Sequence, residues 1–220
     1  MGQHGDKARA ALLDAAEELF ARYGIDAVSN RRIAEQAGTA NHSAVAYHFG
    51  GRDELLRTLI TRHLEDTNTR RTALLERLTP DAGLPELLAA MVLPWVDHLD
   101  SLPAPSWRAR FLHQIRSVPS VHNLLTGSSE ASPAMEELIA RTQAAAGQVP
   151  APVLYGRSSI LGSMVLGVCA EYEARLQDGV ETPNWSGVGY FLIDACVGML
   201  AAPVTHPGDF LARPSSVYLL

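Results

Sequence analysis

Glycine residues divide the beginning of the chain into helical segments that are each only a few turns long. They stand at Gly24, at Gly38 and at the pair Gly50 and Gly51. Apolar residues between them recur at a spacing of three to four, and a glycine directly after such a segment is typical of a left-handed helix cap. The pattern predicts a helix over 7–23, a second helix of about two turns over 30–37, and a third that ends near residue 49.

The second and third of these helices begin at polar residues. Ser29 stands directly before 30–37, where its hydroxyl can accept a hydrogen bond from a backbone amide that has no partner inside the helix. Asn41 can cap the third helix in the same way, so we expect that helix to run from there to about Phe49. Two short helices joined through a glycine turn and braced by a longer first helix form a helix-turn-helix.

The third helix is polar on the side that it does not need for packing. Ala44, Val45 and Phe49 are available for burial. The side chains that then project elsewhere are Asn41, His42, Ser43, Tyr47 and His48. They donate and accept hydrogen bonds at short reach, as base edges and phosphate oxygens in a DNA major groove require. The alternative is that they are ordinary solvated positions, with Tyr47 half-buried against the next helix.

Positive charge near this segment is local. The whole chain carries a net charge of −6, which speaks against a protein that coats nucleic acid by bulk electrostatics. Residues 1–80 hold 11 of the 18 basic residues and 11 of the 24 acidic ones, so the whole negative excess lies after residue 80. Within 28–52, Arg31, Arg32 and Arg52 stand with a single acidic residue and can supply the attraction for phosphate.

The stretch from Leu12 to Leu56, LLDAAEELFARYGIDAVSNRRIAEQAGTANHSAVAYHFGGRDELL, resembles the TetR family of bacterial transcriptional repressors. The resemblance implies a three-helix DNA-binding domain over 1–52. It also implies a helical ligand-binding and dimerisation domain over 53–220, which opens with a connecting helix over 53–78. On this basis we expect a ligand-responsive repressor that binds a palindromic double-stranded DNA operator as a dimer and is released by a small-molecule effector.

The resemblance also implies roles for single residues. Ser29 and Arg31 match residues of the second helix that commonly touch phosphate or bases, and Arg52 matches a basic residue that commonly clamps a phosphate. The recognition helix is matched by Asn41, His42, Ser43 and Tyr47. One departure is Ala46, where many relatives carry an aromatic residue, so a usual phosphate contact is lost or shifted onto Tyr47.

The remainder of the chain is also predicted to be helical, which makes the protein all-α. Arg52 opens a long amphipathic helix that runs to about residue 78, and at about 1.5 Å per residue it is long enough to connect two domains. Further helices, separated by turns that carry proline or glycine, are predicted over 85–102, 106–126, 133–147, 152–178 and 186–202.

The last two of these helices, 152–178 and 186–202, contain many small residues among large apolar ones. Glycine lowers helix stability, so its repeated use indicates a backbone that comes close to another helix. That helix belongs either to the same chain or to a second copy, and the resemblance favours a homodimer through these two helices. A two-fold dimer would place two recognition helices about one turn of DNA, ~34 to 36 Å, apart.

Aromatic and apolar residues with a few polar ones between them predict a ligand pocket in the middle of the chain. The candidates are Met91, Trp95, His98, Trp107, Phe111, His113, Tyr155 and Met164. The alternative for each of them is a plain core or surface position. Walls of this kind predict an apolar or aromatic effector.

The sequence lacks the short motifs of common enzyme classes, namely HExxH, GxSxG, a glycine-rich phosphate loop and a cysteine pair. We therefore expect neither an enzyme nor a cofactor or metal site. Two alternatives stay open at this point. One is a helical adaptor or ligand-binding protein that does not bind DNA, and the other is a helical-bundle enzyme whose catalytic residues lie far apart in the sequence.

The compartment follows from cysteine usage and from hydropathy. Cys169 and Cys196 lie in apolar segments as free thiols and fit a reducing compartment. The N-terminus lacks the apolar core of a signal peptide, and the most apolar stretches, 158–170 and 186–204, are shorter than the ~20 residues of a bilayer span. The sequence therefore predicts a cytoplasmic protein without membrane contact.

Overall fold

The structure, a computed structural model, describes residues 3–118, 121, 132–147 and 149–205. The regular elements in these residues are α-helices, so the prediction of an all-α protein is confirmed. In chain order they are α1 (Gln3–Tyr23), α2 (Asn30–Gln36), α3 (Ala44–Phe49), α4 (Arg52–Thr61), α5 (Leu64–Leu75), α6 (Leu84–Ser101), α7 (Arg108–Ser117), α9 (Pro133–Ala145), α10 (Ala151–Gln177) and α11 (Trp185–Ala201).

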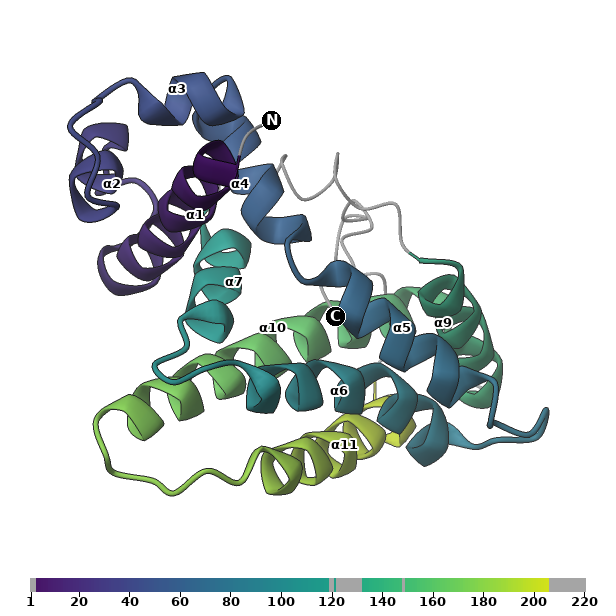
Figure 1. Cartoon of the computed structure of the whole chain (residues 1–220). Helices are drawn as coiled ribbons and strands as arrows, with labels where there is room; N and C mark the ends of the chain where they lie inside the picture. Colours follow the sequence, from purple (N-terminus) through teal and green to yellow (C-terminus); the bar gives the residue numbers. More distant parts are fainter. Residues whose placement is uncertain (1–2, 119–120, 122–131, 148, 206–220) are drawn as a thin grey trace.

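The helices form two lobes (Figure 1). The N-terminal lobe consists of α1 to α4, and the C-terminal lobe consists of α5 to α11. In the C-terminal lobe α11 packs on α6, α10 packs on α7, and α5 packs on both α6 and α9. The lobes meet mainly where α7 lies against α1.

One apolar core runs through both lobes. Its N-terminal part contains Phe20, Val45 and Leu59, each fully buried. The core continues into the C-terminal lobe because the ring of Phe111 in α7 stacks on that of Phe20, with centroids 6.2 Å apart. Each of these residues lies on the apolar face of its own helix. Burial of that face against the other helices stabilises each helix in the fold.

The predicted continuous helix over 52–78 is wrong, because the chain forms α4 and α5 with a break at His63. Arg108 of α7 binds the chain at this break. Its guanidinium donates hydrogen bonds to the last carbonyls of α4, those of Leu59 and Ile60, at 2.6 and 2.9 Å. These carbonyls would lead into the next turn of an unbroken helix. The chain departs there from helical geometry, with φ −120° and ψ 8° at His63.

The third helix begins later than predicted. The side chain of Asn41 accepts a hydrogen bond from the backbone amide of Ser43 at 2.9 Å and so forms a turn before the helix. Asparagine commonly bonds to the backbone two residues on in this way, and the bond competes with helix capping. As a result α3 starts at Ala44 and not directly after Asn41.

The other helix boundaries follow the predictions with two exceptions. The first helix starts at Gln3, four residues earlier than predicted. The helix predicted over 106–126 is much shorter, since α7 ends at Ser117 where Val118 turns extended. Of the remainder of that range, residues 119–120 and 122–126 lie outside the described residues. Helices α2, α6, α9, α10 and α11 begin and end within two residues of the predicted positions.

Two glycines of the last helices make room for side chains of the same chain. A Cβ added to Gly162 in α10 would lie 3.2 Å from the guanidinium of Arg116, and one added to Gly189 in α11 would lie 2.8 Å from Val96 of α6. At these two positions the close approach indicated by glycine is therefore made within the chain. Gly198 of α11, by contrast, has nothing within 4 Å of an added Cβ.

Helix α10 has 27 residues and, among the helices of the described residues, is long and apolar enough by length and composition to cross a bilayer. From the sequence, the apolar stretch 158–170 is expected to be too short to span a bilayer. The helix that contains it is longer, so this expectation about length is wrong. A core helix of a globular protein meets the same criterion. In the described residues α10 packs on α7, and 39% of its most apolar window is buried.

Candidate nucleic-acid interface

Local hydrogen bonds set the shape of the segment from α2 to α3. The hydroxyl of Ser29 accepts from the backbone amide of Arg32 at 3.2 Å, which is the predicted N-cap. After α2 the chain turns at Gly38, whose φ of +73° is a conformation that favours glycine. The turn at Asn41 then leads into α3, which ends at Gly50 with φ +75°. The two helices and their connection form the predicted helix-turn-helix.

The polar residues of this segment are exposed at the end of the molecule away from α11 (Figure 1). Tyr47 exposes 80% of its surface on α3, so it is not half-buried against α4. Asn41, His42 and Ser43 are exposed in the turn before α3. His48 is half-buried, and its ring lies edge-on to that of Tyr47 at 4.9 Å. The opposite side of α3 is buried through Ala44, Val45 and Phe49, as predicted.

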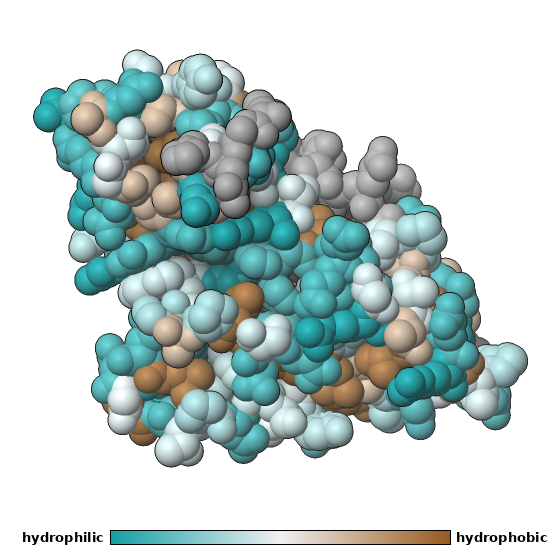
Figure 2. Space-filling model, viewed as in Figure 1, coloured by the Kyte–Doolittle hydropathy of each residue, from teal (hydrophilic) through white to brown (hydrophobic). Residues whose placement is uncertain are grey.

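Basic side chains border this polar surface. Arg31 of α2 is 71% exposed and pairs with Glu35 at 2.8 Å. Exposed pairs one helical turn apart contribute little free energy, so this pair can open to bind an anion at small cost. Arg32 lies over the ring of Tyr23, 4.0 Å from its centroid. The space-filling view shows a largely hydrophilic surface on the N-terminal lobe (Figure 2).

Arg52, predicted to clamp a phosphate, is turned inward. Its guanidinium donates to the carbonyls of Val28 and Ile25 and lies 4.9 Å from the centroid of the Phe20 ring. Partial burial lowers the pKa of Arg52, an effect opposed by nearby carboxylates. The side chain ties the loop before α2 to the start of α4. A phosphate contact by Arg52 stays a prediction, next to this structural role.

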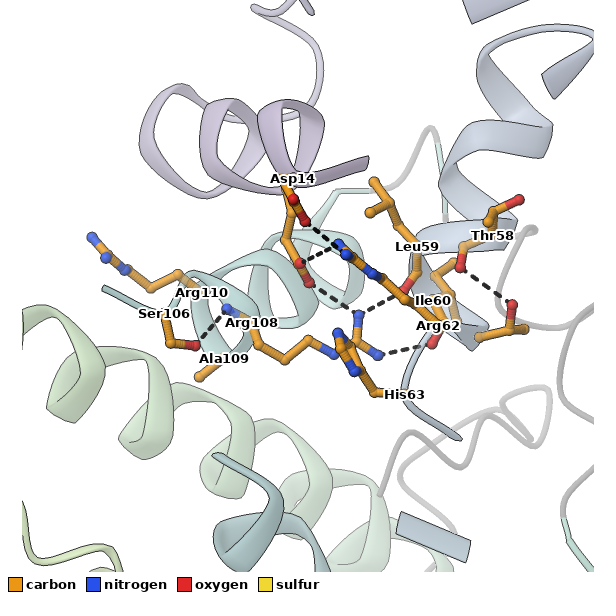
Figure 3. Close-up of polar contacts among 12 residues, drawn as sticks. Asp14, Thr58, Leu59, Ile60, Arg62, His63, Ser106, Arg108, Ala109 and Arg110 are labelled. Atoms are coloured by element: carbon orange, nitrogen blue, oxygen red, sulfur yellow. Dashed lines mark hydrogen bonds and ion pairs between the residues drawn. The ribbon is translucent and has the colours of Figure 1, made fainter. Parts of the chain in front are cut away.

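A buried arginine joins the N-terminal lobe to α7 (Figure 3). The guanidinium of Arg108 donates to Glu17 of α1 at 3.2 Å and to the carbonyls of Leu59 and Ile60 at the end of α4. Arg62 reaches the same carboxylate at 3.6 Å. Burial lowers the pKa of Arg108, and the charge of Glu17 opposes this shift. One charge network thus holds α1, α4 and α7 together.

The start of α7 is held from the other side by Glu173 of α10. Its carboxylate accepts from the backbone amides of Ala109 and Arg110, both at 3.1 Å, and from the hydroxyl of Ser106 at 2.9 Å. An anion at a helix N-terminus is stabilised by unpaired amides and by the helix dipole. Burial raises the pKa of Glu173, and these hydrogen bonds oppose the rise. Helix α7 therefore connects α10 to α1 and α4 through polar contacts at its first turn.

Two imidazoles lie at the break between α4 and α5. The rings of His63 and His98 are 4.8 Å apart, and Nδ1 of His98 donates to Asp66 at 2.9 Å. Burial, together with the charge of Arg108, lowers the pKa of His63 to about 3. Burial also lowers the pKa of His98, although the bond to Asp66 acts in the opposite direction. Both rings are therefore neutral at neutral pH.

Two of the eight residues predicted to line a ligand pocket lie at the junction of the lobes. Phe111 is fully buried against Phe20. Two guanidinium groups contact the ring of Trp107. Cζ of Arg22 lies 5.4 Å and Cζ of Arg110 lies 4.4 Å from the ring centroid. The structure therefore gives these two aromatic residues a part in joining α7 to α1.

The other six candidates lie on three helices of the C-terminal lobe. Trp95 and His98 are buried on α6, and Met91 is half-buried one turn earlier. His113 on α7, and Tyr155 and Met164 on α10, are also half-buried. A groove of ≈ 480 Å³ lies elsewhere, between the end of α10 and the start of α11, and the eight candidates are absent from its lining. The ligand pocket stays a prediction.

Sequence reasoning missed the charged residues that connect the lobes, although a signal was present. Arg108 precedes Phe111, Leu112 and Ile115 at the spacing of one helix face, and Glu173 follows Cys169 in the same manner. A charged residue on an otherwise apolar face indicates a buried ion pair or a buried ligand contact. Among the residues that the structure describes, no cluster of three His, Cys, Asp or Glu side chains could hold a metal ion.

Comparison with known proteins agrees with this geometry. Residues 12–59 match the family described as bacterial regulatory proteins, tetR family. The chain is 25% identical over 126 residues to the HTH-type transcriptional regulator SrpR of Pseudomonas putida. That alignment covers 57% of this chain and 55% of the relative, so the chain spans little more than half of the relative's length.

Two solved structures are similar in outline. One is described as a TetR-family transcriptional regulator of Mesorhizobium loti, at 17% identity and a TM-score of 0.46, with 91% of this chain and 98% of that chain covered. The other is a TetR-family regulator of Streptomyces coelicolor, at 18% identity and a TM-score of 0.39, with 91% and 99% covered. Similarities of this size have no bearing on function.

Proposed function

We propose that this chain, whose residues 12–59 match the family described as bacterial regulatory proteins, tetR family, is a member of that family and a ligand-responsive repressor. It binds a palindromic DNA operator as a homodimer in the cytoplasm and leaves the operator when a small apolar or aromatic effector binds. The matching family is described as bacterial regulatory proteins, and the relative in Pseudomonas putida as a transcriptional regulator.

The observation that carries the proposal is the exposed polar surface of α3 and of the turn before it. A two-turn helix with a tyrosine that is 80% exposed has no packing reason to present that side chain to water. Tyr47, with Asn41, His42 and Ser43, has the reach and the hydrogen-bonding groups for base edges. Arg31 and Arg32 are exposed on α2, the other helix of the helix-turn-helix. These contacts would combine sequence readout with phosphate attraction.

Dimerisation is supported by the outer faces of α10 and α11. Ile160 of α10 is 54% exposed, and Tyr190 and Phe191 of α11 are 61% and 63% exposed. Large apolar side chains gathered on two neighbouring helices are typical of an interaction surface. A second copy packed there in a two-fold arrangement would bury these side chains in both chains.

The effector response is supported by the polar contacts at the start of α7. A ligand that binds in the C-terminal lobe can release DNA only if it favours an arrangement of the lobes that does not fit the operator. Glu173 and Arg108 hold the first turn of α7 between α10 and the end of α4. A displacement of α7 would therefore be carried to α4 and to the recognition helix.

The test is a titration of the full-length protein against a labelled DNA fragment from beside its own gene, at several salt concentrations. We expect the logarithm of the binding constant to fall linearly with the logarithm of the salt concentration, because bound phosphates release counterions. Arg31→Ala should weaken binding and reduce this slope by about 1. Ser43→Ala should alter sequence preference more than salt dependence.

Arg77→Ala is the matched control, since Arg77 is an exposed arginine that lies after α5, outside the proposed interface. The DNA affinity of this variant, and the dependence of that affinity on salt concentration, should equal those of the unaltered protein. Failure to retain any fragment at low salt would overturn the proposal, as would equal weakening by Arg31→Ala and Arg77→Ala.

A further inference from the structure

Arg71 of α5 carries a buried guanidinium that has no counter-ion among the described residues. The residue is 1% exposed. Nη1 donates to the side-chain oxygen of Asn68 at 2.8 Å, whereas Nε and Nη2 have no hydrogen-bond partner. No carboxylate among the described residues acts on its pKa, which burial alone lowers to about 10. The group is therefore a cation at neutral pH.

An arrangement of this kind is costly for a folded chain. A charge that leaves water loses its hydration, and only a partner ion with well-placed hydrogen bonds compensates for that loss. Asn68 is a neutral partner and fills one of the five N–H donors of the guanidinium. An anion that joined Arg71 would relieve this cost directly.

The two unused nitrogens define the shape of that anion. Nε and Nη2 lie on one edge of the planar guanidinium, and their N–H groups point in parallel from it. This edge binds the two oxygens of a carboxylate through two parallel hydrogen bonds. Since Asn68 occupies the opposite nitrogen, Nη1, the free edge is the one suited to a carboxylate.

The surroundings of Arg71 suit an apolar molecule. α5 packs against α6 and α9, and Figure 1 shows these three helices together in the C-terminal lobe. Leu74, Leu75 and Met91 pack against the small apolar cluster that these helices form. The same helices carry two further buried polar atoms that lack a partner, Nε2 of His98 and Oγ1 of Thr142.

We propose that Arg71 binds the carboxylate of an organic acid whose apolar body lies among α5, α6 and α9. The inference deepens the proposed function, because it takes that acid to be the effector and so gives the effector a carboxylate next to its apolar or aromatic part. The binding itself requires no DNA.

The first measurement compares unfolding temperatures of the full-length protein with matched compounds: benzoate and benzamide, phenylacetate and phenylacetamide, octanoate and octanamide. Acetate and inorganic phosphate serve as anions without an apolar body. We expect at least one organic acid to raise the unfolding temperature by several degrees, while its amide and the two small anions do not. A response to phosphate alone, to acids and amides equally, or to none of the compounds would overturn the proposal.

The second measurement uses variants and isothermal titration with the responding acid. Arg71→Met should lose about tenfold to hundredfold in affinity, because a charge-assisted pair is removed. Arg71→Lys keeps the positive charge but lacks the two parallel N–H groups of the guanidinium. It also provides the affinity test if Arg71→Met fails to fold. It should lose affinity too. Arg77→Met, a control at an exposed position, should bind as the unaltered protein does.

Stability without ligand separates this role from a structural one. Arg71→Met should unfold at the same or a higher temperature, since the cation that it removes is unpaired. A lower unfolding temperature of Arg71→Met together with an unchanged affinity of Arg71→Lys for the acid would mean that Arg71 serves the fold, and the proposal would fail. If the acid binds through Arg71 but does not release operator DNA, the site stands and the proposed effector role fails. If the protein binds DNA but no acid binds, this inference alone fails.

Discussion

The guanidinium of Arg108 and the carboxylate of Glu17 meet at 3.2 Å although the two residues lie 91 positions apart. Both are buried, at 2% and 8% exposure. The contact joins the first turn of α7 to the middle of α1, and the same guanidinium also binds the end of α4. Any change in the position of α7 must therefore either carry these helices along or break a buried ion pair.

Arg108→Met should lower the free energy of unfolding by about 3 to 5 kcal/mol, because it leaves the carboxylate of Glu17 and the two carbonyls of α4 without their donor. Urea unfolding followed by circular dichroism measures this. The double variant Arg108→Met with Glu17→Gln should be less destabilised than the sum of the two single variants, since both remove the same pair. A loss below about 1 kcal/mol for Arg108→Met would show that the pair does not hold the lobes together.

The comparison of sequence with structure separates local from distant causes. Ser29 caps α2 as predicted because the cap depends on residues three positions apart. The break at His63 could not be predicted from the helical pattern of 52–78, because Arg108, which binds the carbonyls at the break, lies 48 and 49 residues beyond them. Similarly, the aromatic character of Trp107 indicated a pocket, whereas its neighbour Arg22 comes from a helix far away in the sequence.

Arg52 and Arg31 should differ in how much each contributes to the free energy of unfolding. Arg52→Ala should lower the free energy of unfolding by about 1 to 2 kcal/mol, a value reduced for partial exposure, because the carbonyls of Val28 and Ile25 lose a charged donor. Arg31→Ala should change stability by less than about 0.5 kcal/mol, since its pair with Glu35 is exposed. Thermal unfolding and DNA titration of both variants check this. Equal stability losses would refute the assigned difference.

Stability should fall as the pH is lowered below about 6.5, the ordinary pKa of histidine. In the folded protein the pKa of His63 is about 3. Between these values the unfolded chain binds a proton that the folded chain does not, so stability rises with pH and is lost on acidification. His98, whose pKa is also lowered, acts in the same direction.

Unfolding temperatures at pH 7.5, 6.5 and 5.5 measure this dependence. His63→Gln should make it shallower, because one of the titrating groups is removed, while His42→Gln, at an exposed position, should leave it unchanged. The prediction fails if His63→Gln and the unaltered protein lose the same number of degrees between pH 7.5 and 5.5.

If the proposed dimer forms, Phe191→Asp should convert it into a monomer, because the substitution places a charge in the apolar surface proposed for α11. Light scattering should then give one chain mass, 23.7 kDa, in place of twice that value. Val180→Asp is the control, since Val180 is 67% exposed in the turn between α10 and α11. Operator affinity should fall with Phe191→Asp only. If the unaltered protein is monomeric at micromolar concentration, the proposal of a dimer is wrong.

Two glycines of α11 should respond to alanine with opposite signs. In a helix alanine is favoured over glycine by about 1 kcal/mol, so the substitution stabilises wherever there is space. Gly198 has that space, and Gly198→Ala should raise the free energy of unfolding by up to about 1 kcal/mol. At Gly189 the new Cβ would lie 2.8 Å from Val96 and 3.2 Å from Leu93, so these side chains of α6 or the helix itself would have to shift.

Overpacking of this kind costs about 1 to 3 kcal/mol and outweighs the gain in helix propensity, so Gly189→Ala should be destabilising on balance. Urea unfolding of the two variants at equal protein concentration measures the difference. The sign at Gly189 decides whether glycine there serves the packing of α11 on α6 within one chain. A stabilising Gly189→Ala would instead mean that this position has room, and the intramolecular explanation of the glycine would be wrong.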